Sequence, residues 1–425
     1  MKKSVHLLPH SRQRQRGAVA IIVGLCIVVL IGMIGLVVDL GHMFITKTEL
    51  QNAADACALA AARELDGGSD ALVRAENVGL TVGQRNNVDL QATAVSIVAN
   101  DISFSATLSP NSGYLTRSAG ANPTTSKYAM CTLNRSGIAM WFMQVLGTGD
   151  QAVGAQAVAT VAPSQTTCAI PIGICEQGSA PTFGFTLGQW YSGKFDSSAP
   201  GGTGSYNWLD FSPNSGGGAD ELKDLLKGAG QCELPPIGAL VGQQGQISGL
   251  SDAWNSRFGV YKNGGQYNTT TSPPDFTGLG YTNTTLMTFA TATTWDPPQN
   301  AYSGTSTTGT SNYLAGQTAR TPYQNTDPAD IGNAYNPSSS ANHSQYGANR
   351  RIAIAPVVDC QDLASSNPQP IPILGYACVL MLNPIKGPDD VFLEFRGMAN
   401  DASSPCASYG IPGGAAGPLV PVLVQ

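Results

Sequence analysis

The sequence predicts an α+β protein: one N-terminal transmembrane helix extends into a long helix outside the membrane, and β-rich domains follow. Three observations lead to this fold class. Residues 18–38 are an apolar run without charge or proline, close to the roughly 20 residues that cross a bilayer as a helix. Helical periodicity of apolar residues continues beyond this run to Leu65. The remainder is rich in Gly and Pro, with 49 and 27 residues in the chain, which favours turns and strands over a helical bundle.

Composition limits the class of protein. At 425 residues the chain is long enough for an anchor and two or three domains. Charged residues make up 12% of it, against about 25% in soluble proteins. The formal net charge of −6 argues against a nucleic-acid binder, which carries a basic face.

Residues 1–17 form a basic tail that predicts the orientation of the anchor. Positive charge is retained on the cytoplasmic side, so the N-terminus is expected in the cytoplasm and the bulk of the chain outside. The basic residues are Lys2, Lys3, Arg12, Arg14 and Arg16.

Cleavage of the N-terminal segment is the alternative to a permanent anchor. A signal peptide has a shorter apolar region, of about 7–15 residues, followed by a small-x-small site, which is absent here. Arg16-Gly17 before an apolar helix is typical of prepilins, but Ile22 stands where prepilins carry Glu. These patterns favour a helix that is retained.

Residues 39–67 are predicted to extend the membrane helix, ending at Gly67-Gly68. The combined helix would have roughly fifty residues and a length of about 75 Å. One stripe of it is apolar or small, and two interpretations are open: packing on the chain's own domain, which we favour, or binding of a partner helix. The candidate partner-binding residues are Leu40, Met43, Leu50, Ala54, Ala61 and Leu65.

The same segment resembles a known family. Arg16-Gly17-Ala18-Val19-Ala20, then Val38-Asp39-Leu40-Gly41-His42, then Thr48 to Ala56 (TELQNAADA) are similar to the N-terminal segment of TadG-like proteins, members of the TadE/TadG group of Tad (Flp) pilus assembly systems. The resemblance implies a bacterial inner-membrane protein with its bulk in the periplasm. It implies contacts with membrane lipid and with other Tad pilus assembly proteins, and a homo-oligomer is compatible with it.

Residues 77–162 are expected to form a small α+β domain, similar in layout to the second domain of TadG-like proteins. Alternating apolar and polar residues predict strands at 88–98 and 102–108. The bulky apolar stretch 136–146 is interpreted as a helix packed on that sheet, and 152–161 as a closing strand.

Three regions follow this domain. Residues 163–261 are a Cys-containing β-rich region, and 262–349 are a polar insertion dominated by Asn, Thr, Ser, Tyr and Gly. Residues 350–425 are a C-terminal β-rich region with strands at 350–360, 371–382 and 390–397. We expect these strands to pair with material around 168–232. The insertion would then form either a surface loop or a contact surface.

Cysteine usage predicts disulfides. Of nine Cys, Cys26 lies in the apolar run, and the even count of the others suits an oxidising compartment. At least two structural disulfides are expected, without assigned pairs. The candidates are Cys57, Cys131, Cys168, Cys175, Cys232, Cys360, Cys378 and Cys406.

The sequence offers little for catalysis, and we predict no catalytic, cofactor-binding or metal-binding residues. Of four His, only His343 lies in the outer domains, so a Ser-His or Cys-His site would have to use it. Asp101-Ile102-Ser103-Phe104-Ser105 fits a metal-binding loop pattern, but its alternation favours a strand. No phosphate-binding loop motif occurs.

The expected function is therefore structural: a membrane-anchored component of a Tad (Flp) type IV pilus or secretion apparatus, acting by protein–protein contacts. An exported or surface adhesin-like protein, using the polar insertion for cell adhesion, is the alternative. The His count disfavours an exported hydrolase.

Overall fold

The computed structural model describes residues 16–109, 113–193, 208–212, 218–242, 249–281, 295–296, 300–306, 309–324, 334–360, 370–385 and 391–425. It has the predicted fold class, a long N-terminal apolar helix followed by a β-rich α+β region. The chain divides into two compact units, residues 1–161 with 421–425, and residues 162–420.

Helix α1 (Arg16–Arg63) is one continuous helix of 48 residues, as the periodicity predicted. Within the described part of the chain, it is the helix long and apolar enough to cross a membrane. Residues 19–34 of the helix are exposed throughout, whereas its second half packs into the first unit. The basic residues before Arg16 lie outside the described residues.

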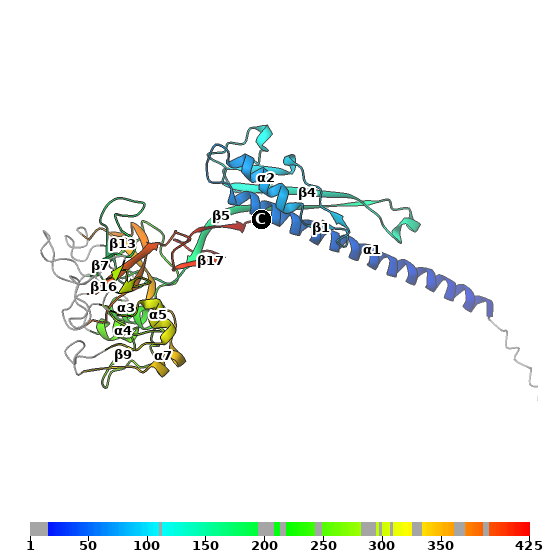
Figure 1. Ribbon diagram of the computed structural model, residues 1–425. Coiled ribbons are helices and arrows are strands. Elements are labelled where there is room, and N and C mark those ends of the chain that lie inside the picture. The colour runs from blue at the N-terminus through cyan, green and yellow to red at the C-terminus, as the bar shows by residue number, and fades with distance from the viewer. Residues whose placement is uncertain are drawn as a thin grey trace, which may run out of the picture. The chain divides into compact units, whose positions relative to one another are not determined.

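The core of the first unit forms between α1, helix α2 (Ala71–Gly83) and an antiparallel sheet in the order β3–β4–β5. The strands are β3 (Ile102–Ser105), β4 (Tyr128–Ile138) and β5 (Gln151–Thr166). Figure 1 shows α2 and β4 beside α1. Small residues of α1, such as Ala53, Ala58 and Ala62, are fully buried there, because side chains of this size let a neighbouring backbone approach closely.

Helix α2 was not expected from the sequence. Its sequence, ALVRAENVGLTVG, contains glycine and β-branched residues that weaken a helix. The packing at Gly79 explains why the helix forms in spite of these residues. A Cβ at this position would lie 3.3 Å from the Cβ of Ala61 on α1. The close approach to α1 therefore overrides the low propensity.

The helix predicted at 136–146 is wrong. Residues up to Ile138 belong to β4, and a 3₁₀ turn, η3 (Met143–Leu146), follows within the hairpin to β5. Gly137 has φ +75°, a left-handed value incompatible with an α-helix. The apolar character that suggested a helix instead belongs to the tip of this β4–β5 hairpin.

The predicted strand at 88–98 is mostly irregular. It contains the short pair β1 (Asn87–Val88) and β2 (Thr93–Ala94), joined by Asp89, Leu90 and Gln91 in left-handed conformations. The strand interpretation of residues 102–105 is confirmed by β3. Two 3₁₀ turns complete the unit, η1 (Ala99–Asp101) and η2 (Arg117–Ala119).

The second unit is built on a five-stranded sheet in the order β6–β13–β15–β16–β7. Strand β13 pairs in parallel with β6, and β16 pairs antiparallel with β7. The C-terminal strands therefore pair with the Cys168–Cys232 region, as expected. The strands are β6 (Ile174–Cys175), β7 (Trp190–Ser192), β13 (Ile352–Val358), β15 (Gly375–Met381) and β16 (Phe392–Met398).

Both faces of this sheet are covered. Along β13, Ile352 and Ile354 face one apolar cluster, whereas Ala353 and Ala355 face another. Helices α3 (Gly218–Lys227) and α4 (Leu250–Ser256) supply apolar residues to the second cluster, and α5 (Tyr313–Ala319) supplies Tyr313 to the first. The all-buried central strands follow from this arrangement.

Several described residues of the polar insertion, 262–349, are buried in the protein interior. Tyr281, Tyr313 and Tyr323 are buried core residues. The Tyr313 hydroxyl donates to the buried carboxylate of Asp275 at 3.1 Å. These long-range contacts between polar residues are invisible to an argument from composition.

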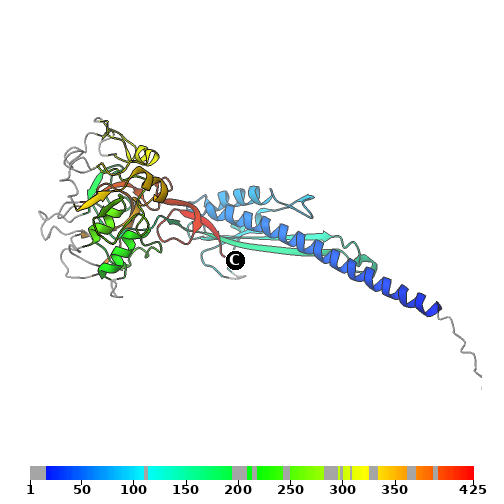
Figure 2. The same ribbon diagram turned by 90° about the horizontal axis from the view of Figure 1, so that it is seen from below.

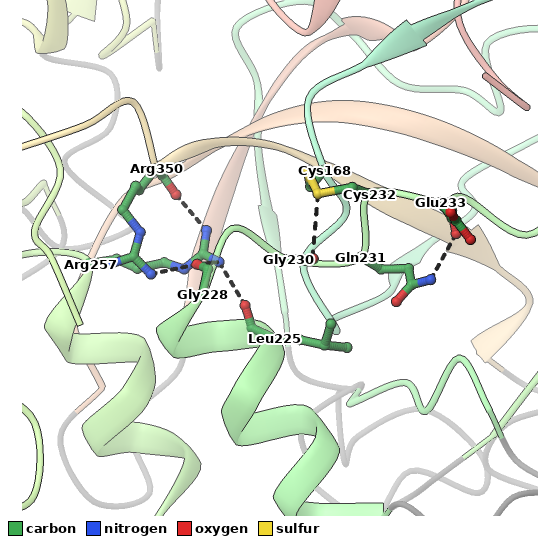
Figure 3. The surroundings of a disulfide bond; sticks show 9 residues. All are labelled: Cys168, Leu225, Gly228, Gly230, Gln231, Cys232, Glu233, Arg257 and Arg350. Carbon is green, nitrogen blue, oxygen red and sulfur yellow. Dashed lines mark hydrogen bonds between the residues drawn. A yellow bond between two sulfur atoms is a disulfide. The ribbon is translucent and has the colours of Figure 1, made fainter. Parts of the chain in front are cut away.

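Two buried arginines hold the C-terminus of α3. Arg257 donates to the carbonyls of Leu225, Leu226 and Gly228, and Arg350 donates to those of Leu226 and Gly228. Figure 3 shows Arg257 and Arg350 converging on this end of the helix, next to the Cys168–Cys232 disulfide. The last carbonyls of a helix have no partner within it, and the guanidinium groups supply one.

Short elements complete the fold. The helix α7 (Ser340–Tyr346) precedes β13. The end of β5 pairs with β17, and β18 also pairs with β5. The remaining strands are β8 (Leu240–Val241), β9 (Val260–Lys262), β10 (Trp295–Asp296), β11 (Thr305–Ser306), β12 (Tyr335–Pro337), β14 (Ile371–Pro372), β17 (Ala407–Pro412) and β18 (Leu419–Leu423).

Candidate functional site

The candidate site is the junction between α1 and the tip of the β4–β5 hairpin, where the apolar run of the helix ends. Figure 2 shows the hairpin strands running alongside α1. Asp39, the first acidic residue of the chain, has 2% of its surface exposed here. Its carboxylate accepts the backbone N–H groups of Trp141 at 2.8 Å, Phe142 at 3.0 Å and Met143 at 2.6 Å.

This arrangement fastens the hairpin to the helix. Three successive N–H groups at a turn have no strand partner, so an ionised carboxylate satisfies them together. A carboxylate with three donors is also well stabilised away from bulk water. Asp39 is therefore a structural clamp between the helix and η3.

His42, one turn further along α1, makes a second connection. Its Nε2 lies 2.7 Å from Oδ1 of Asp89 in the β1–β2 loop. Its ring stacks on that of Trp141 at 4.5 Å between centroids, with 8° between the planes. His42 thus joins the hairpin tip and the β1–β2 loop to the same level of the helix.

Gly35 brings the hairpin against the apolar run itself. A Cβ at this position would lie 2.5 Å from Cβ of Phe142, so glycine is required for the contact. Beside it is a half-open, mostly apolar groove of about 190 Å³. Its lining residues are Leu36, Asp39, Leu40, Met43, Met140, Met143, Thr148 and Gln151.

The residues that make this junction on α1 lie in a segment with a recognisable family pattern. Residues 17–64 match the family described as "Putative Flp pilus-assembly TadE/G-like". The N-terminal segment of this chain is a TadE/G-like domain. No curated protein and no solved structure matched the chain.

The matched range coincides with α1, which ends at Arg63. A TadE/G-like domain and, among the described residues, one helix that could span a membrane support a Tad pilus-associated, single-pass membrane protein.

The stripe of six candidate partner-binding residues divides into two groups on this TadE/G-like domain. Leu50, Ala54, Ala61 and Leu65 are buried in the core of the first unit, as the favoured interpretation of packing on the chain's own domain expected. Leu40 is exposed and Met43 half-buried, both on the groove at the hairpin. Partner binding at these two residues stays a prediction.

All eight candidate cysteines are paired in the structure, as Cys57–Cys131, Cys168–Cys232, Cys175–Cys360 and Cys378–Cys406. Cys26 is free and exposed on the apolar half of α1. The first pair connects α1 to β4 and so fixes the TadE/G-like helix to the sheet of its own unit.

His343 lies in a Ser–His pair with the geometry of a nucleophile and its base. Its Nε2 is 3.0 Å from Oγ of Ser338, and its Nδ1 is 2.7 Å from the backbone oxygen of Asp275. The His343 side chain is fully buried, and burial lowers its pKa. Both nitrogens are occupied in the interior, so the pair ties α7 to the segment before α5.

Two carboxylates outside the hairpin junction, Asp101 and Glu394, have structural partners. Asp101 accepts the backbone N–H of Val98 at 2.8 Å, which caps η1. Glu394 accepts hydrogen bonds from Trp190, Ala301, Tyr302 and Arg396, while burial raises its pKa to about 7. Among the described residues, no group of three or more His, Cys, Asp or Glu could hold a metal ion.

The sequence did not predict the hairpin tip. Two signals were available: an isolated acidic residue, Asp39, directly after an apolar run, and an adjacent Trp141-Phe142 pair four residues after Gly137. Because 102 positions separate Asp39 from Trp141, no local pattern connects them.

Proposed function

We propose that this chain is a membrane-anchored structural component of a Tad (Flp) pilus assembly or secretion apparatus. It acts through protein–protein contacts and performs no catalysis. It is a single-pass protein of the bacterial inner membrane, with its N-terminus in the cytoplasm and its bulk in the periplasm.

The observation that carries this proposal is the rigid connection between the membrane anchor and the first unit. The anchor and the first folded unit share one helix of 48 residues, and that helix is fixed to the sheet by the Cys57–Cys131 disulfide and the Asp39 clamp. No hinge separates the membrane anchor from the first unit. A part that holds or aligns other components of a machine needs such a rigid connection.

Two features support the orientation. The basic residues of the first 17 positions favour a cytoplasmic N-terminus. Four disulfides require an oxidising compartment for the folded part. Both features predict the same membrane orientation, although they lie on opposite sides of the apolar run.

Site-specific photo-crosslinking in cells tests the contacts. Asn52 and Arg63 are exposed on the outer half of α1, whereas Ala54 on the same helix is fully buried. Crosslinkers at the exposed positions should capture another Tad pilus component, or a second copy of this chain, and one at Ala54 should capture neither. Equal yields at all three positions, or none at any position around the helix, would count against the proposal.

Fractionation separates this proposal from the adhesin alternative. Retention with the inner membrane supports an assembly component, and release or surface exposure supports adhesion. The alternative relied on the Tyr-rich insertion, and burial of Tyr281, Tyr313 and Tyr323 removes part of that support.

A further inference from the structure

The outward face of α1 remains apolar well beyond residue 38. Leu40, Phe44 and Ile45 are all exposed. The first polar residues on this face are Lys47 and Thr48. Judged by its exposed surface, the helix changes from apolar to polar between Ile45 and Lys47.

The polar residues within this segment face the opposite side. Asp39, His42 and Thr46 are spaced by three and four positions, so they share one helical face. All three are buried, and the first two are bonded to the hairpin and the β1–β2 loop. Asp39 therefore does not mark the end of the lipid-facing surface, because its side chain does not face outward.

The length of the exposed apolar surface fits a complete bilayer. Val19 to Ile45 covers 27 residues, or about 40 Å at 1.5 Å per residue. A bilayer has a hydrocarbon core of about 30 Å, and about 40–45 Å including headgroups. The last turns before Lys47 thus correspond to the headgroup layer.

The hairpin tip lies beside these same turns and exposes two aromatic side chains. Trp141 is 52% exposed and Phe142 44% exposed. Phe142 contacts the helix at Gly35, and Trp141 is held at Asp39 and His42. Tryptophan is enriched at the membrane–water interface, where its ring and N–H suit both environments.

From these observations we infer that the β4–β5 hairpin tip is a second membrane contact. Trp141 and Phe142 insert into the interfacial layer of the leaflet nearest the folded domain, beside α1. The occupant of this surface is lipid, because the hairpin is continuous with the lipid-exposed face of the helix. The two contacts together fix the depth and the tilt of the anchor. This inference rests on the membrane anchoring proposed above.

Tryptophan quenching by brominated lipid tests it in the full-length protein. Nanodiscs contain phosphatidylcholine brominated near the headgroup end of its acyl chains, or the same lipid without bromine. The chain has five Trp, so quenching of one should remove up to about a fifth of the emission of the wild type. Trp141→Phe, a mild substitution, should abolish this lipid-dependent loss.

A matched control keeps the background constant. Val98 is 56% exposed in the same unit, and its neighbour Ile97 packs at Cys57, about 27 Å along α1 from Asp39. The double variant Trp141→Phe/Val98→Trp restores a fifth tryptophan far from the interface, which should not be quenched.

The inference fails if bromine lowers the tryptophan emission of the wild type and of Trp141→Phe by the same amount. The same result is expected if a protein partner, and not lipid, covers the hairpin tip. Resistance to alkaline carbonate extraction from membranes is measured in parallel. Retention without Trp141 quenching would overturn the hairpin contact alone, whereas extraction of the wild type would overturn the anchor itself.

Discussion

The Asp39 carboxylate on α1 accepts the backbone N–H of Met143 at 2.6 Å, across 104 positions of the sequence. Because two more N–H groups of the hairpin bind the same carboxylate, Asp39 holds three consecutive hairpin residues at the helix. The Asp of the Val-Asp-Leu-Gly pattern in the TadE/G-like domain thus has a physical role, which is to position a distant loop.

Asp39→Asn should loosen the hairpin without unfolding the unit. An amide offers one acceptor oxygen in place of two and removes the charge that strengthens the bonds. Hydrogen exchange at Trp141 to Met143 should become faster by on the order of tenfold or more, measured by mass spectrometry on the detergent-solubilised protein. Asp150→Asn, at an exposed residue of the same hairpin, is the control and should leave these amides unchanged. Unaltered protection in Asp39→Asn would contradict the clamp.

The parts predicted from the sequence are those determined by local pattern. The continuous α1 follows from length and periodicity, and β13 and β15 follow from short apolar runs. The hairpin could not be predicted, because its partner Asp39 lies about a hundred residues away. Helix α2 depends on glycines that reduce propensity but permit packing.

The polar insertion, residues 262–349, also shows that local sequence does not predict long-range contacts. Its composition is polar, yet Tyr313 and Asp275 meet in the interior. Polar groups are buried where they satisfy one another, and composition contains no information about which groups will meet. For the candidate site, the sequence indicated the correct helix, but it left open whether its apolar stripe packs on the chain's own domain or on a partner, and four of the six residues pack on the chain's own domain.

Non-reducing peptide mapping should recover the four pairs of the structure. We expect linked peptides for Cys57–Cys131, Cys168–Cys232, Cys175–Cys360 and Cys378–Cys406, with alkylation at Cys26. The double variant Cys57→Ala/Cys131→Ala should destabilise the first unit by roughly 4 kcal/mol, since its closed loop spans about 74 residues. Cys26→Ala serves as the control. Alkylation of Cys57 or Cys131 in protein taken from the native membrane would contradict this connectivity.

Arg257→Lys should destabilise the second unit by about 3 kcal/mol. The guanidinium of Arg257 reaches carbonyls at the end of α3 and the carbonyl of Arg350. A lysine ammonium has at most three donors and a different geometry, so it would leave buried carbonyls without partners. Chemical denaturation followed by tryptophan fluorescence reports on this unit, which contains the buried Trp190, Trp208 and Trp254. Lys262→Arg, at an exposed position, should have no effect, and an equal loss in both variants would refute the specific role of Arg257.

The two buried titrating groups His343 and Glu394 should act in opposite directions as pH changes. Burial lowers the pKa of His343, so the unfolded state takes up a proton near pH 6.5 before the folded state does, and acidification costs stability. Burial raises the pKa of Glu394 to about 7, so stability is lost as pH rises from about 4.5 to 7.

His343→Gln should therefore make the protein gain more stability, or lose less, than the wild type when pH falls from about 7.5 to 5.5. Glu394→Gln should produce the opposite change in slope. Denaturation midpoints measured across this pH interval decide between the outcomes. Parallel pH profiles for the wild type and both variants would show that neither group titrates differently on folding.

Two glycines on the same helix allow a matched test of how the hairpin contacts α1. Gly35→Ala places a Cβ 2.5 Å from Cβ of Phe142, whereas a Cβ at Gly32 meets nothing within 4 Å. Because the two positions share the helix and the change is one methyl group, differences in propensity cancel. Gly35→Ala should displace the hairpin tip, shown by faster amide exchange at residues 141–143 and a red shift of Trp141 emission. Gly32→Ala should leave both unchanged, and similar effects from the two variants would mean that the hairpin does not rest on the helix at Gly35.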